Sequence, residues 1–143
     1  MRKKSRLDTM RLIASAHPAL RTSPTLTDIV HELNRIAAAE RSDKADSWLL
    51  KVLHTTRALD TSLSEVLAHK GWSPQKNFSL GSYIIELEKR GVLTMRQRVD
   101  FQRNIVDKRN RYMHRAGAMP NRLDANSVLN EMDSCLSFVL ANT

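Results

Sequence analysis

Residues 109–114 carry side chains that suit acid–base and phosphate chemistry. They read R-N-R-Y-M-H and place a guanidinium, an amide and an imidazole within two helical turns. An imidazole with an ordinary pKa of about 6.5 can carry protons near neutral pH. A guanidinium can bind two oxygens of one phosphate and stabilise the charge that develops there. Because Asn110 and His114 are four residues apart, a helix would let the amide hydrogen-bond the imidazole and fix its tautomer.

A single helix from about Thr94 to His114 is expected to position these side chains, with Gly117 and Pro120 ending it. At about 100° per residue, its apolar side chains share one arc. That arc contains Val99, Phe101, Ile105, Val106, Tyr112 and Met113. Arg98 and Arg109 also project into it, rather than onto the face expected to meet solvent. A paired arginine in the core, a subunit interface and a cleft are three explanations that the sequence leaves open.

The same projection separates Arg109 from His114 by about 140°. The two side chains therefore need not face one point within a single chain. A two-fold axis passing this end of the helix would bring Arg109, Asn110 and His114 together with their copies. A composite site in a homodimer is therefore one use for an arginine on an interface-like face.

The remaining elements are expected to be helices with short connections. Apolar residues recur at helical spacing in residues 26–37, 49–67, 80–87 and 125–140, and a short helix follows the Ser5-x-x-Asp8 capping pattern. The prediction is an all-α fold, a four- to five-helix bundle. Residues 1–24 are expected to form a basic tail or short helix, and residues 25–143 the bundle domain.

Composition supports one helical domain. The chain has 143 residues, 41% of them hydrophobic and only 5% aromatic, which suits a single core without sheets. It has no apolar stretch of about 20 residues and no signal-peptide pattern, so a cytoplasmic protein without a membrane span is expected. The one cysteine, Cys135, has no internal partner, and no Cys/His cluster has zinc spacing. Neither a metal nor a cofactor is predicted.

The positive charge is concentrated in two segments. The formal net charge is +8; residues 1–22 carry six basic and one acidic residue, and residues 89–115 carry nine basic and two acidic ones. Clustered Lys and Arg attract polyanions, because each phosphate contact releases counterions. An ordinary solvated basic helix is the alternative.

The segment Arg109-Asn110-x-x-x-His114 resembles the hallmark of the HEPN superfamily, in which Arg and a polar residue precede His near the end of a long helix. Ser79-Leu80-Gly81, which opens a short helix, and the turn at residues 89–93 are also similar to that family. The resemblance covers residues 79–117 well and the rest only through the number of helices.

The resemblance implies a homodimeric, metal-independent endoribonuclease of the kind found in bacterial toxins, anti-phage effectors and RNA-processing systems. His114 would transfer protons, Arg109 would stabilise the phosphorane, and Asn110 would orient His114 or bind the phosphate. RNA-binding roles would fall to Lys108, Arg111, Arg115 and Tyr112, the tyrosine through base stacking or, instead, through packing. An antitoxin or regulatory partner is also implied, although Ala116 stands where members paired with nucleotidyltransferase antitoxins often have Tyr.

A non-catalytic helical module that binds nucleic acid or a protein partner is the second hypothesis. It uses the same basic segments and assigns Arg109 and His114 to interface hydrogen bonds. Binding that weakens with salt, without RNA breakdown in EDTA, would distinguish it from the nuclease.

Overall fold

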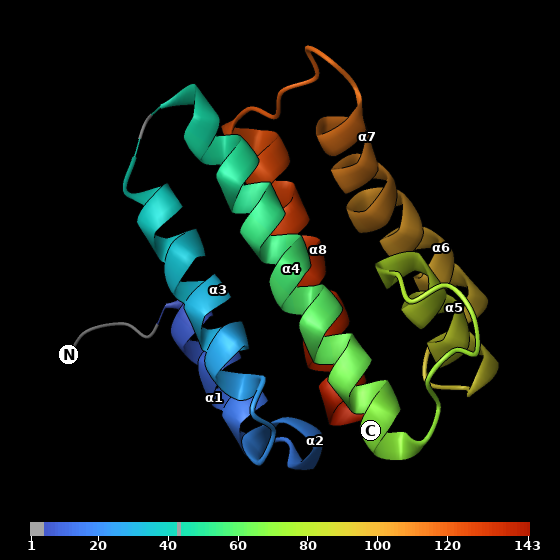
Figure 1. Cartoon of the computed structure of the whole chain (residues 1–143). Coiled ribbons are helices and arrows are strands. Elements are labelled where there is room, and N and C mark those ends of the chain that lie inside the picture. Colours follow the sequence, from blue (N-terminus) through green and yellow to red (C-terminus); the bar gives the residue numbers. More distant parts are fainter. Residues whose placement is uncertain (1–4, 43) are drawn as a thin grey trace.

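The computed structural model describes residues 5–42 and 44–143, and in these residues the protein is helical without strands. The long helix α4 runs through the middle, with α3 and α1 on one side, α8 behind it, and α5, α6 and α7 on the other side (Figure 1). The helices are α1 (Arg6–Ala16), α2 (Pro18–Arg21), α3 (Leu26–Glu40), α4 (Ala45–Lys70), α5 (Leu80–Lys89), α6 (Met95–Phe101), the π-helix η1 (Gln102–Asp107), α7 (Lys108–His114) and α8 (Arg122–Ala141). The predicted all-α class is confirmed.

Local capping explains why the helices begin and end at these residues. Capping boxes start three of them, at Ser5 for α1, Thr94 for α6 and Asn121 for α8. In each box a side-chain oxygen accepts the third backbone N–H, which would otherwise lack a partner. The long helix α4 ends at Gly71, whose φ of 72° lies in the left-handed region that glycine adopts without strain.

One large core joins α1, α2, α3, α4, α5, α6, η1 and α8. Its largest fully buried side chains include Met10, Leu20, Ile29, Leu33, Leu59, Leu63, Ile84 and Ile105. A smaller cluster of Val52, Ala125 and Val128 lies between α4 and α8, with Trp48 and Tyr112 packed against it. This second cluster attaches the beginning of α8 and the end of α7 to α4.

The number of helices exceeds the predicted four or five. The described residues contain seven helical runs when α6, η1 and α7 are counted as one. The addition is partly α2, which follows His17 directly. Here His17 caps the new helix by accepting the backbone N–H of Ala19, and Pro18 occupies its first position, where a missing N–H costs nothing.

Residues 5–24, which the sequence analysis separates from the bundle, contribute to the same core. Leu7, Met10, Ala14, Ala19 and Leu20 are all buried in it. The beginning of the chain is helical over Arg6–Ala16 and Pro18–Arg21. Residues 1–4, which hold three of its basic side chains, lie outside the described part.

The predicted helix from Thr94 to His114 is continuous, but its middle is a π-helix. Gln102 Nε2 donates to Asp107 Oδ1 at 3.0 Å, a contact between side chains five residues apart that suits the wider π turn. A π turn adds about one residue to the repeat, so the side chains after it are set back by about 100° relative to an ideal α-helix. Because Arg109 and His114 both follow the π turn, their mutual separation does not change.

Candidate functional site

Helix α7 presents the R-N-x-x-x-H segment at one end of the bundle. It packs against α4, and Tyr112 is half-buried against the cluster of Val52, Ala125 and Val128. Burial raises the pKa of Tyr112, and the charge of Asp124, to which its hydroxyl is hydrogen-bonded, raises it further. Tyr112 therefore anchors α7 to the first turn of α8. Of the two roles expected for this side chain, base stacking and packing, the structure shows packing.

Arg109 is half-buried and held by its neighbour. Its Nη2 and Nε donate to Asn110 Oδ1 at 2.8 Å and 3.3 Å. The Asn110 oxygen is therefore occupied by the guanidinium. In the part of the chain that the structure describes, the expected hydrogen bond between Asn110 and His114 does not form.

Asp60 of α4 is the acidic group near Arg109. Burial raises the pKa of Asp60, and the positive charge of Arg109 offsets part of that rise. No direct ion pair joins the two among the described side chains, so the interaction acts across a longer distance. The guanidinium is thus bonded to an amide on its own helix, and its charge acts on a half-buried carboxyl of α4.

Sequence reasoning missed Asp60, although a signal for it exists. Asp60 stands seven residues after Leu53 and seven before Leu67, within the apolar stripe of the long helix. A carboxylate in such a stripe faces other helices instead of open solvent, and it needs a compensating cation.

Arg98, the second arginine of the predicted apolar arc, forms an ion pair with Glu88 of α5 at 2.9 Å. Of the three explanations left open for Arg98, a paired arginine, a subunit interface and a cleft, the structure shows the paired arginine.

His114 lies in the last turn of α7 and is exposed. In residues 5–42 and 44–143 it makes no hydrogen bond or ion pair. Its imidazole is exposed to solvent, whereas the Arg109 guanidinium is half-buried and bonded to Asn110. Among the described residues, no hydrogen bond joins the two side chains.

The basic side chains expected to bind RNA differ in their exposure and in their contacts with other helices. Lys108 is half-buried, and its Nζ donates to Ser127 Oγ of α8 at 3.5 Å. Arg111 and Arg115 are exposed and form no ion pair with other described residues. Two of the three cations are thus available for a ligand, and the third is directed toward α8.

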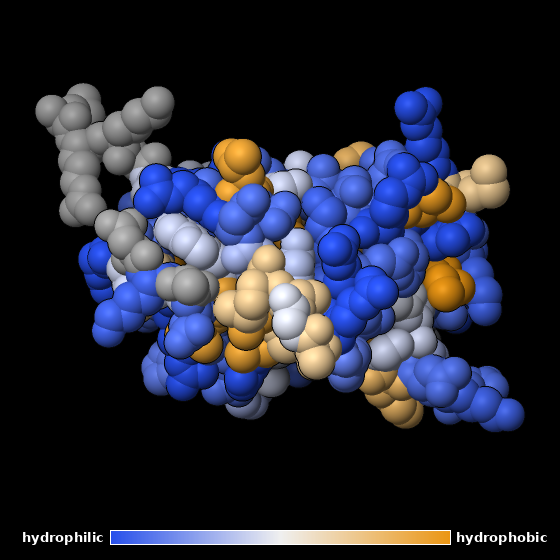
Figure 2. Space-filling view, turned by 90° about the horizontal axis from the view of Figure 1, so that it is seen from above, coloured by the Kyte–Doolittle hydropathy of each residue, from blue (hydrophilic) through white to orange (hydrophobic). Residues whose placement is uncertain are grey.

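The exposed cations of α7 belong to a larger basic end of the bundle. The end of α3, the beginning of α4, the end of α7 and the beginning of α8 lie at this same end of the molecule, with α4 and α8 between α3 and α7 (Figure 1). We call this surface the basic end; its exposed cationic residues are Arg41, Lys44, Arg111, Arg115 and Arg122. Figure 2 looks onto it and shows a mostly hydrophilic surface with a few apolar side chains. Only two of the five belong to the basic segment 89–115, so the clustering depends on tertiary structure.

Two further observations concern metal binding and membrane spanning. Within the described residues, no group of three or more His, Cys, Asp or Glu side chains is arranged to hold a metal ion. None of the helices in that part of the chain combines the length and apolar character needed to cross a membrane.

Comparison with models of known protein families, with curated proteins and with solved structures gives no match. The resemblance to the HEPN superfamily therefore rests on the sequence alone, on residues 79–117 with the segment from Arg109 to His114.

Proposed function

We propose that the protein is a metal-independent endoribonuclease of the HEPN type, acting in a bacterial toxin or anti-phage context. One observation carries the proposal: helix α7 at the basic end holds an exposed imidazole, which has no hydrogen bond to any described residue, and a half-buried guanidinium held by Asn110. A reactive imidazole must reach the substrate, whereas an electrostatic group works best when it is held in place before the reaction.

The proposed reaction is attack by a ribose 2′-hydroxyl on the adjacent phosphorus. The 2′-oxygen loses its proton to a base, the bond between phosphorus and the 5′-oxygen breaks, and that oxygen receives a proton. The products are a 2′,3′-cyclic phosphate and a 5′-hydroxyl. His114 transfers the protons and Arg109 stabilises the charge on the phosphorane, while Arg111 and Arg115 bind neighbouring phosphates.

A homodimer completes this site. Because the two side chains diverge by about 140° around one helix, Arg109 of one chain would act with His114 of its partner. Asn110 and Asp60 then position the guanidinium, and Tyr112 fixes the helix against α8.

The test is RNA cleavage in EDTA by the wild-type protein, His114→Ala and Arg109→Ala. Both variants should lose cleavage by at least about a hundredfold, the range that one acid–base or charge-stabilising group contributes. His69→Ala is the matched control, because His69 is an exposed histidine at the opposite end of α4. Full activity in His114→Ala would refute the assignment.

A non-catalytic module that binds RNA or a partner protein is the second candidate. The divergence of Arg109 and His114 within one chain favours it, because binding does not require the two to meet. It predicts RNA binding at the basic end that weakens as salt rises, with intact RNA after incubation. Arg111→Gln and Arg115→Gln would then weaken binding, while His114→Ala would not change it.

A further inference from the structure

The π-helix η1 is the one π segment among the described residues, and it lies directly before α7. A π turn holds one residue more than an α turn, and such turns occur mostly as single interruptions of α-helices, frequently at functional sites. The proposed reaction gives no role to this turn. Its position makes the direction of α7 the property that the additional residue can control.

Three kinds of contact hold the turn in its wide form. Ile105 and Val106 are buried in the main core. On the outside, Gln102 Nε2 donates to Asp107 Oδ1 at 3.0 Å. A Cβ atom at Gly81 of α5 would lie 3.3 Å from Gln102 Oε1 and 3.7 Å from Val106 Cγ1, so glycine lets α5 approach the turn closely. The turn is thus fixed by packing on its inner side and by a bond between side chains on its outer side.

The additional residue decides which side chains of α7 face the bundle. If residues 102–107 formed an ordinary α-helix, every later side chain would advance by about 100° around the axis. Each would then take the direction that its successor has now. Lys108 would take the direction of Arg109, and Arg111 would take that of Tyr112.

The direction of Tyr112 is an apolar one, because this side chain packs against the smaller cluster between α4 and α8. Arg111 is exposed. Burying a guanidinium against an apolar cluster without a partner is costly. The π turn therefore allows a tyrosine to meet the cluster and leaves Arg111 in solvent.

The direction of Arg109 is the one that matters for phosphate chemistry. Its guanidinium is bonded to Asn110, and its positive charge acts on Asp60 of α4. An ordinary helix would place Lys108 in this direction. An ammonium is a point charge, whereas a guanidinium can bind two phosphate oxygens in a fixed geometry. The additional residue thus selects the arginine for this position.

We propose that the π turn is the positioning element of the Arg109–His114 site, because its one additional residue sets the direction of α7. Gly81, Gln102 and Asp107 hold the turn and are positioning residues, since none of them contacts the RNA in the proposed reaction. The proposal rests on the ribonuclease function for the role of Arg109. The direction of α7 itself can be measured without RNA.

Two length variants at Arg103 test the proposal. Arg103 is exposed and has no hydrogen bond or ion pair with another described residue. Deleting it removes the additional residue and leaves Gln102 and Asp107 four positions apart, the spacing at which side chains meet on an α-helix. The direction of α7 should then stay unchanged. Inserting one alanine after Arg103 should instead advance α7 by about 100°.

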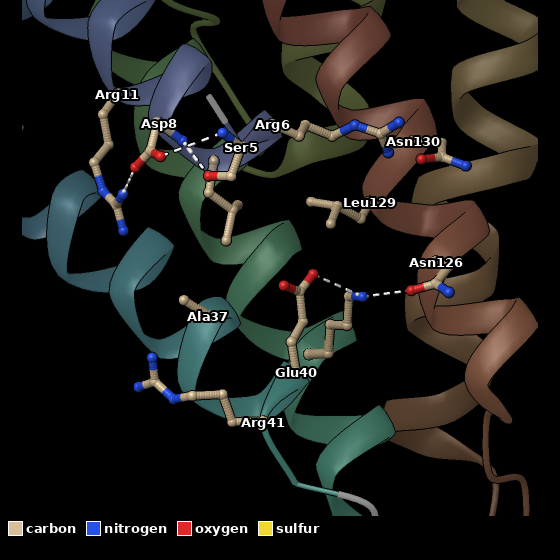
Figure 3. A pocket seen from close by; sticks show the side chains of 12 residues that line it. Ser5, Arg6, Asp8, Arg11, Ala37, Glu40, Arg41, Asn126, Leu129 and Asn130 are labelled. Atoms are coloured by element: carbon tan, nitrogen blue, oxygen red, sulfur yellow. Dashed lines mark hydrogen bonds and ion pairs between the residues drawn. The ribbon is translucent and has the colours of Figure 1, made fainter. Parts of the chain in front are cut away.

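Maleimide labelling of Arg111→Cys reports the direction of α7. Cys135 does not interfere, because it is buried and its thiol has a pKa raised to about 12. Arg41→Cys supplies the rate of an exposed thiol; Figure 3 shows the Arg41 side chain beside the pocket between α1, α3, α4 and α8, directed away from Glu40. The thiol at position 111 should match this rate in the wild-type and deletion backgrounds. In the insertion background it should react about tenfold more slowly.

RNA cleavage in EDTA, measured without the cysteine substitutions, completes the test. The deletion variant should stay within about threefold of the wild type, and the insertion variant should lose at least about a hundredfold. In an ordinary α-helix both changes would turn α7 by about 100°, so this asymmetry is specific to the π turn. Circular dichroism checks that both variants are folded.

Slow labelling in the deletion variant, or equal labelling in the deletion and insertion variants, would overturn the proposal. Loss of cleavage in a deletion variant that labels like the wild type would also overturn it. If the insertion variant is unfolded, the deletion variant decides alone, because shortening an ordinary helix would turn Arg111→Cys into the half-buried direction of Asn110. If the wild type cleaves no RNA, the ribonuclease proposal fails, while labelling still decides whether the turn sets the direction of α7.

Discussion

Two groups, Asn110 and Asp60, act differently on the guanidinium of Arg109. Asn110 fixes its direction through two hydrogen bonds, and the Asp60 carboxyl supplies opposite charge from α4. Since burial raises the pKa of Asp60 more than Arg109 lowers it, the ionised carboxylate costs stability in the folded protein.

Asp60→Asn is expected to raise the free energy of unfolding at pH 7 and to lower RNA cleavage about tenfold. The folded-state pKa of Asp60 is raised, so the ionised carboxylate destabilises the folded protein above that pKa. This destabilisation disappears as pH falls through the folded pKa and below the unfolded value of 3.8. The stability gain of the variant should therefore shrink in acid. Urea unfolding at pH 7 and pH 4, with cleavage assays, measures both effects; a loss of stability at pH 7 would contradict this account.

At the scale of the elements, residue patterns predicted where the helices lie along the chain, but not which side of each helix faces its neighbours. Ser79 caps α5, the short helix that the sequence analysis expects to open there, and Gly71 ends the long helix, because caps and glycine act through local geometry. No capping residue or glycine in the sequence indicates the π turn at residues 102–107. Its position depends on packing against α5 and α8, and it changes the phase of every later side chain in the run.

The corner between α1 and α2 also depends on contacts distant in sequence. His17 Nδ1 accepts the Ala19 N–H, and His17 Nε2 lies 3.0 Å from Thr143 Oγ1. The Thr143 hydroxyl already donates to the Val139 carbonyl, so it accepts from Nε2. These contacts require the neutral imidazole. Burial, with the charges of His69 and Lys70, lowers the pKa of His17 in agreement with this geometry.

The protein is therefore expected to lose stability as pH falls below about 6.5, the ordinary pKa of His17. Below this pH His17 binds a proton in the unfolded chain but not in the folded protein, so the free energy of unfolding falls. The fall levels off below the pKa of His17 in the folded protein. His17→Asn keeps a capping oxygen and should reduce the difference in unfolding midpoint between pH 7.5 and pH 5.5. An unchanged difference in this variant would show that His17 does not carry the effect.

Leu20 and Leu12 form a matched pair for the role of the first helices. Leu20 is fully buried, whereas Leu12 is 52% exposed. Leu20→Ala should lower the free energy of unfolding by about 2–5 kcal/mol, and Leu12→Ala by less than about 0.5 kcal/mol. Equal small effects in chemical denaturation would mean that residues 5–24 are not part of the cooperative core.

At the scale of the whole molecule, four helix ends create a surface that no single segment contains. The basic end combines arginines from α7 and α8 with cations next to α3 and α4. Charge counting identified residues 89–115, yet Arg41 and Arg122 join them only because the bundle brings these helix ends together (Figure 1). The same arrangement leaves Arg109 and His114 diverging, which is why the proposed site requires a second chain.

Mixing two inactive variants tests that requirement. If Arg109 of one chain acts with His114 of its partner, a dimer of Arg109→Ala with His114→Ala holds one complete site and one empty site. Random assortment makes about half of the dimers mixed, so about a quarter of wild-type activity should return. Co-expression followed by cleavage assays measures this recovery. No recovery, despite mixed dimers detected by differential tags, would contradict the composite site.

The most direct test of the central claim is the chemistry of the RNA ends produced in EDTA. We expect the wild-type protein to leave 2′,3′-cyclic phosphates or their hydrolysis products and 5′-hydroxyls, and His114→Ala to leave the RNA intact. Fragments with 3′-hydroxyl and 5′-phosphate ends, or the same cleavage by His114→Ala, would contradict a ribonuclease mechanism centred on His114.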